Sequence, residues 1–167
     1  MTGPDGPLEV AAPVEVPAAP GSALEAFRAR RRKRRHVDLK VPDTEPAIWV
    51  RYGPLPQHRI DAHVMRYAKS KDPDRTVKRE AALLAEACVG VFEVVDGREV
   101  SIDPDARDAE WPTFGPELAV LLGIPATGAG EIVRALYGED AALMATSEKY
   151  AEWLQVTVEE RDDRPEA

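Results

Sequence analysis

The stretch TVKREAALLAEACVGVFEVVDGREVSI, residues 76–102, carries two different hydrophobic periodicities in direct succession. In its first part, apolar residues recur at spacings of four, three, four and three, which predicts one buried face of an amphipathic helix. The residues on this face are Val77, Ala81, Leu84, Cys88 and Val91. Asp72-Pro73, just upstream, suits a helix start because Asp caps free amides and proline fits the first helical position.

The second part of the stretch predicts a β-hairpin. Residues 92–95 and 99–102 flank Asp96-Gly97, a dipeptide that accepts the positive φ angles of a tight turn. A similar pattern lies upstream, where residues 37–41 alternate at period two and Ile48, Val50 and Tyr52 resume the alternation after a Pro-containing loop. The chain therefore carries one or two small β-hairpins.

Helices account for most of the remaining chain. Ser22 and Glu25 form an S-x-x-E capping pattern that predicts a helix over residues 23–35. Apolar spacing predicts a helix around residues 60–67, and Pro116 and Gly123 mark the start and end of another. Two further helices are expected over residues 130–137 and 139–157. The predicted fold class is α+β, mainly α: a helical domain with one or two small β-hairpins.

Composition divides the chain into four parts. Residues 1–21 contain five prolines and three glycines and are expected to form a flexible tail. Residues 22–36 form a basic helix or linker, and residues 37–158 form a single mainly helical domain. The charged residues 159–167 are expected to form a frayed C-terminal tail.

Charge and cysteine content indicate a soluble protein of the cytoplasm. Seven of the eight residues from Arg28 to Arg35 are basic, and without them 15 basic and 30 acidic residues remain, a net charge of −15. The single cysteine, Cys88, allows no internal disulfide. No apolar run is long enough for a membrane-spanning helix, and the N-terminus has no export-signal pattern.

The sequence contains no convincing catalytic set, so we expect no enzyme, no cofactor and no metal site. His36, His58 and His63 are interpreted as surface residues, since their spacing does not suit a metal site. Cys88 lies on the predicted buried face and is interpreted as core. The glycines at 128–130 lack the rest of a nucleotide-binding motif, and the aspartates at 103, 105 and 108 are expected in a solvated loop.

The basic run is the sharpest local feature. As a helix, residues 28–35 would place positive charge on every side, which favours nucleic-acid contact with steep salt dependence. The residues are Arg28, Arg30, Arg31, Arg32, Lys33, Arg34 and Arg35. The run lacks interleaved aromatics for base stacking, so a solubilising segment, or one that docks on an acidic surface, remains an equal alternative.

A set of aromatic residues supplies candidates for partner contact, because aromatics are enriched at the centres of protein interfaces. The candidates are Trp49, Tyr52, Trp111, Phe114 and Trp153. At least half of them are expected to be ordinary core residues. Trp49 is the best candidate because it lies on the strand face opposite to Ile48, Val50 and Tyr52. A hairpin covered on one face only would leave Trp49 partly exposed.

The order of elements over residues 37–157 resembles the tail assembly chaperones of long-tailed bacteriophages. The segments that carry the resemblance are WVRYGPL (49–55), REAALLAEACVGVFE (79–93), FGPELAVLLGI (114–124) and EIVRALYGEDAALMATSEKYAEWL (131–154). The resemblance is one of pattern and order, without an invariant motif. The N-terminal tail and the basic run depart from the family pattern.

This resemblance implies a small, non-enzymatic protein that binds the aggregation-prone tape measure protein and helps tail-tube subunits polymerise around it. Its implied location is the bacterial host cytoplasm, and the acidic C-terminus would be where a frameshifted longer product continues. The implied partners are the tape measure protein and the tail-tube protein, and self-association stays open. Composition alone would equally suit a scaffold or an adaptor.

Overall fold

The computed structural model describes residues 22–105 and 111–162, without the side chains of residues 31–34 and 158–162. The predicted tail at residues 1–21 and the end of the predicted C-terminal tail, residues 163–167, lie outside this part. The chain divides into a unit that ends at Arg35 and a unit of residues 36–167, close to the predicted boundary. In the described part, no helix combines the length and apolar content that crossing a membrane requires.

Helix α1 (Ala23–Arg35) is the element of the first unit that the structure describes. Its start confirms the predicted capping pattern, since the backbone N–H of Glu25 donates a hydrogen bond of 3.2 Å to the Ser22 hydroxyl. Leu24 and Phe27 are more than half exposed, and the cations Arg28, Arg30 and Arg35 are exposed as well. The helix therefore presents apolar residues in its first turns and basic residues after them.

The second unit contains one four-stranded antiparallel sheet in the order β1-β2-β3-β4. Its strands are β1 (Val37–Lys40), β2 (Ala47–Tyr52), β3 (Cys88–Val95) and β4 (Arg98–Ser101). Both predicted hairpins are confirmed, and φ angles of +52° at Asp96 and +76° at Gly97 form the predicted tight turn. The sequence did not predict that β2 pairs with β3, which joins the two hairpins into one sheet.

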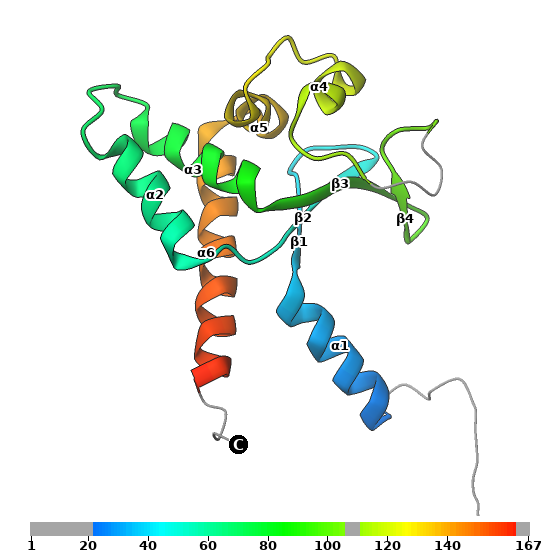
Figure 1. Cartoon of the computed structure of the whole chain (residues 1–167). Helices are drawn as coiled ribbons and strands as arrows, with labels where there is room; N and C mark the ends of the chain where they lie inside the picture. Colours follow the sequence, from blue (N-terminus) through cyan, green and yellow to red (C-terminus); the bar gives the residue numbers. More distant parts are fainter. Residues whose placement is uncertain (1–21, 106–110, 163–167) are drawn as a thin grey trace, which may run out of the picture. The chain divides into compact units, whose positions relative to one another are not determined.

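Five helices of the second unit are described, and Figure 1 shows α3 leading directly into β3. They are α2 (Gln57–Ala68), α3 (Arg75–Ala87), α4 (Pro116–Leu122), α5 (Ala129–Tyr137) and α6 (Asp140–Asp162). The mainly α, α+β fold class is confirmed. Helix α6 extends through the first residues of the predicted frayed tail.

The predicted position of Cys88 and Val91 on a helix is wrong, because α3 ends at Ala87 and both residues belong to β3. The valines of this segment are β-branched and favour an extended backbone, and Gly90 weakens a helix. The predicted start also shifts. Helix α3 begins at Arg75, and the Asp72 carboxylate accepts a hydrogen bond from the Asp74 backbone N–H at 2.8 Å in the turn before it.

The core lies between one face of the sheet and the helices. Val50, Tyr52 and Val91, all fully buried, share this sheet face. They belong to one apolar cluster with helical residues that are equally buried, including Leu84, Leu118, Ile132 and Leu143. The opposite sheet face carries Trp49, Arg51 and Phe92 and contributes nothing to this cluster.

A set of hydrogen bonds at the end of β2 fastens the helices to the sheet. Gly53 donates its backbone N–H to the Ala87 carbonyl at 2.8 Å, and its own carbonyl accepts the Tyr150 hydroxyl at 2.8 Å. The hydroxyl oxygens of Tyr52 and Tyr137 lie 2.8 Å apart in the core. Burial raises the pKa of Tyr137 to about 12, so its hydroxyl stays protonated at neutral pH.

Replacing Tyr150 with phenylalanine is expected to lower the free energy of unfolding by about 1–2 kcal/mol, because the buried Gly53 carbonyl loses this partner. Urea denaturation followed by circular dichroism measures the change. Tyr67→Phe is the control, since Tyr67 is half-buried and its hydroxyl has no hydrogen bond within the described residues. Equal stability of the two variants would contradict the anchoring role of Tyr150.

Candidate functional site

Helix α2 packs against α3 (Figure 1). A groove lies on either side of α2. Among the residues of α2, only His63 is buried. The wide groove, which we define by its walls α2 and α5, has a volume of about 810 Å³. The narrow groove, between α2 and α6, has a volume of about 230 Å³. Both have α3 as their floor.

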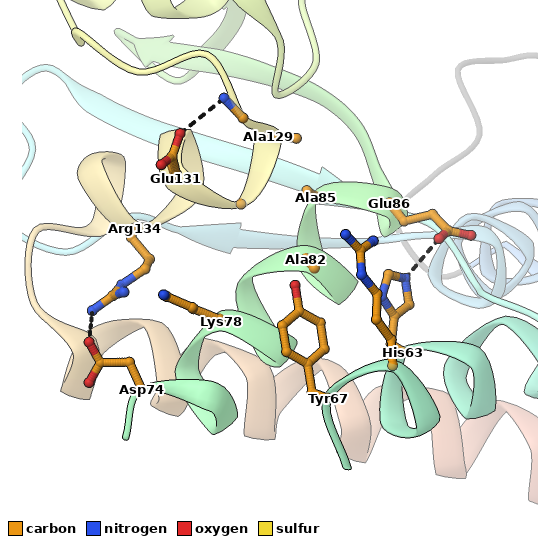
Figure 2. A pocket seen from close by; sticks show the side chains of 13 residues that line it. His63, Tyr67, Asp74, Lys78, Ala82, Ala85, Glu86, Ala129, Glu131 and Arg134 are labelled. Atoms are coloured by element: carbon orange, nitrogen blue, oxygen red, sulfur yellow. Dashed lines mark hydrogen bonds and ion pairs between the residues drawn. The ribbon is translucent and has the colours of Figure 1, made fainter. Parts of the chain in front are cut away.

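Small residues form the floor of the wide groove. Ala82 and Ala85 line it from α3, and Gly130 lines it from α5, where a Cβ would be in ordinary contact with the Ala82 nitrogen at 3.6 Å. Figure 2 shows this groove with Tyr67, Lys78 and Arg134 among its lining side chains. The wide groove therefore has an apolar floor and a polar rim.

Ion pairs neutralise the cations at one end of the wide groove. Lys78 pairs with Asp72, which raises the pKa of the lysine and lowers that of the carboxyl. Arg134 lies 3.0 Å from a carboxylate oxygen of Asp140 and 3.6 Å from one of Asp74 (Figure 2 draws the Asp74 pair). These cations are held by the protein's own acids, so they do not form a free anion site.

A second charged cluster lies at the other end. The Arg59 guanidinium donates two hydrogen bonds to Glu86, at 2.7 and 2.8 Å. His63 Nε2 lies 2.8 Å from the same carboxylate (Figure 2). Arg59, and then His63, lower the pKa of Glu86 to about 2. The prediction that all three histidines are surface residues is wrong for His63, which is 9% exposed because this pairing satisfies its ring nitrogen.

The wide groove offers little for catalysis. None of its 13 lining residues is a serine, threonine or cysteine that could act as a nucleophile. Glu86 stays ionised near neutral pH and is a weak general base because its pKa is so low. In residues 22–105 and 111–162, no group of three or more His, Cys, Asp or Glu side chains could hold a metal ion.

Cys88 lies outside both grooves. Its burial raises the thiol pKa to about 12, so almost no thiolate exists at neutral pH. This agrees with the interpretation of Cys88 as a packing residue, although it lies on a strand and not on a helix.

The narrow groove is mainly apolar. Its apolar lining comes from α2, α3 and α6 and consists of Ile60, Val64, Leu83, Tyr150, Ala151 and Leu154. Polar groups occur at Glu80, whose carboxylate accepts hydrogen bonds from the Ser147 hydroxyl and the Arg79 guanidinium. On α2, Val64 is 43% exposed and its neighbour Met65 is 76% exposed. The narrow groove and this edge of α2 form an apolar surface that is open to solvent.

Two predicted partner-contact residues are core residues, so the prediction is wrong for them. Tyr52 is fully buried and Phe114 is 6% exposed. Tyr52 faces inward on β2, where the alternation of the strand puts it with Val50. Phe114 packs in the same core cluster. A partner cannot reach either ring.

Trp49 and Trp111 belong to the opposite side of the sheet, as predicted for Trp49. Trp111 stacks on Phe92 with ring centroids 4.3 Å apart, and Phe92 pairs with Trp49 across the strands. The Arg51 guanidinium lies 4.9 Å from the Trp111 ring centroid and bonds to Asp38 at 2.8 and 2.9 Å. Both tryptophans are half-buried.

The structure does not bring the predicted contact residues together. Trp153 is half-buried on α6, with its ring centroid 5.9 Å from that of Tyr150 in the narrow groove. Of the basic residues, Arg28, Arg30 and Arg35 are exposed on α1. The side chains of Arg31, Arg32, Lys33 and Arg34 lie outside the described residues, as does Asp108 of the predicted acidic loop.

Comparison with protein-family models, with curated protein sequences and with solved structures found no match to this chain.

Glu86→Gln is expected to destabilise the protein near neutral pH by weakening the contacts with Arg59 and His63. Because folding lowers the pKa of Glu86 from 4.5 to about 2, its stabilising contribution is present above pH 4.5 and is lost as the pH falls towards 2. Urea midpoints of the wild type and the variant should therefore converge between pH 4.5 and 2. A difference in urea midpoint that stays constant over this pH range would contradict the assignment. The control is Glu117→Gln, which changes an exposed carboxylate of α4.

Gly90→Ala is expected to displace Trp111, because a Cβ at this position would lie 2.8 Å from the Trp111 Cβ. We expect a loss of about 1–3 kcal/mol of stability and a red shift of tryptophan emission. The control is Gly130→Ala, whose new Cβ would make only contacts of ordinary length and should preserve stability. Unchanged emission in Gly90→Ala would show that Trp111 does not cover this strand.

Proposed function

We propose that this protein is a non-enzymatic tail assembly chaperone that binds apolar helices of a tape measure protein. The observation that carries the proposal is the narrow groove, an apolar depression between two helices. Helix-in-groove binding uses such surfaces, with an amphipathic partner helix inserting side chains at spacings of three and four residues. Ile60, Val64 and Leu154 supply aliphatic contacts for such side chains.

The exposed residues beside the narrow groove extend this surface. Val64 and Met65 together continue it onto the outer side of α2. Methionine adapts its shape to different partner side chains, which suits a protein that must bind many similar helical segments in succession. A chaperone needs weak, repeated apolar contacts, and this surface is small enough to provide them.

The charge of the second unit supports the same role. Residues 36–167 contain 15 basic and 26 acidic residues, a net charge of −11. A strongly charged exterior keeps a complex with an apolar partner in solution. The wide groove supports the non-enzymatic part of the proposal, since Glu86, Lys78 and Arg134 of its lining are held in ion pairs.

The proposed partners are the tape measure protein and, during assembly, the tail-tube protein. The proposed site of action is the bacterial host cytoplasm, where tails assemble. The tape measure partner would be the product of a very long gene downstream of this one, encoding a helical protein with repeated apolar faces. A frameshifted longer product would continue the chain from the acidic C-terminus.

The test is co-expression of the full chain with that downstream product. Val64→Lys and Ala151→Lys each place a charge in one wall of the narrow groove. Burying an unpaired charge against an apolar helix costs more than about 1.4 kcal/mol, so the co-purified amount should fall about tenfold or more.

Matched controls place the same charge elsewhere on the same helices. Ala62→Lys on α2 and Ala145→Lys on α6 alter exposed residues that line neither groove. They should leave co-purification unchanged, with urea midpoints reported for all four variants. Wild-type co-purification by folded Val64→Lys and Ala151→Lys would reject the narrow groove as the binding site.

A further inference from the structure

Helix α1 belongs to neither groove and carries a concentration of charge that the chaperone role does not use. Seven of its last eight residues are basic, whereas the rest of the chain has a strong excess of acid. The described cations Arg28, Arg30 and Arg35 are all exposed. Only Arg28 has an ion pair in the described part of the chain, a 3.8 Å contact with Glu25. These guanidinium groups are therefore available to an external polyanion.

The helical positions of these cations limit the shape of that polyanion. At 3.6 residues per turn, Arg28 and Arg35 lie about two turns apart on the same side of α1, while Arg30 lies on nearly the opposite side. A flat anionic surface would contact one side only. The major groove of duplex DNA is about 12 Å wide and has phosphates along both edges, so it surrounds a helix with negative charge.

The apolar residues of α1 fit a membrane less well. Leu24 and Phe27, 54% and 56% exposed, occupy only the first turns, and the following turns are basic. An amphipathic helix on a membrane needs an apolar face along its length. The basic residues from Arg28 to Arg35 follow these apolar residues, so no apolar face runs along the helix.

We propose that α1 is a binding site for duplex DNA, contacting phosphates on both sides of the major groove. The second unit, with its net charge of −11, repels phosphates, so binding is expected through α1 alone. Guanidinium groups bind phosphate oxygens without regard to base sequence. The site is thus one of electrostatic, sequence-independent contact. It shares no residue with the narrow groove.

The test measures fluorescence anisotropy of a labelled 20-base-pair duplex with the full chain between 50 and 200 mM salt. With about six phosphate contacts, affinity should fall about 10³-fold over this range. R28A/R30A/R35A should reduce the magnitude of the slope of log affinity against log salt by about 3. Alanine favours helix, so circular dichroism should show α1 retained.

Two further variants separate charge from other effects. R28K/R30K/R35K keeps the positive charge and should keep the wild-type salt slope. K69A/K71A/K149A removes three exposed cations of the second unit and should bind DNA like the wild type. Binding to vesicles of anionic and neutral lipid is measured in parallel, with L24S/F27S as the variant that lowers membrane affinity.

Three results would overturn the proposal. They are the absence of duplex binding at 50 mM salt, wild-type binding by R28A/R30A/R35A, and vesicle binding that is tighter than duplex binding and lost in L24S/F27S. None of them bears on the narrow groove, because its variants are tested by co-purification.

Discussion

The backbone of Gly53 is the point on which the arrangement of the second unit depends. Its N–H binds the last residue of α3, its carbonyl binds Tyr150 of α6, and the preceding Tyr52 meets Tyr137 of α5. Three helices are thereby fixed to the end of one strand. Helix α2 is not part of this set and packs mainly against α3, with a groove on each of its sides. The grooves thus follow from how the sheet is anchored.

Local patterns predicted the elements, and long-range pairings escaped prediction. The Asp96-Gly97 turn, the Ser22 cap and the Pro116–Gly123 helix all depend on residues close in sequence, and all are present. The β2–β3 pairing joins strands separated by two helices, so no local signal specifies it. The valines of residues 89–95 carried a strand signal that the helical spacing of Cys88 and Val91 concealed.

For the candidate site, the sequence indicated which types of residue could contact a partner, but not which of them would be exposed. Strand alternation correctly separated Trp49 from Tyr52, yet the choice of aromatics included Tyr52 and Phe114, which are core. His63 can be buried because Glu86, 23 positions away, provides a hydrogen-bond partner for its ring nitrogen. No short sequence motif predicts this pairing. The narrow groove needs three helices to converge, and the apolar spacing at residues 60–67 predicted only the helix that forms one of its walls.

Two surfaces of opposite character emerge: an apolar groove on an acidic body and a basic helix. Site-specific photo-crosslinking is the most direct test of helix binding by the groove. A photoreactive residue at Ala151 lies in the groove wall, and one at Ala145 lies on the same helix outside it. With the tape measure protein co-expressed, crosslinks should form from position 151 to its apolar helical repeats and be absent from position 145. Equal yields from both positions, or none from 151, would contradict the proposed function.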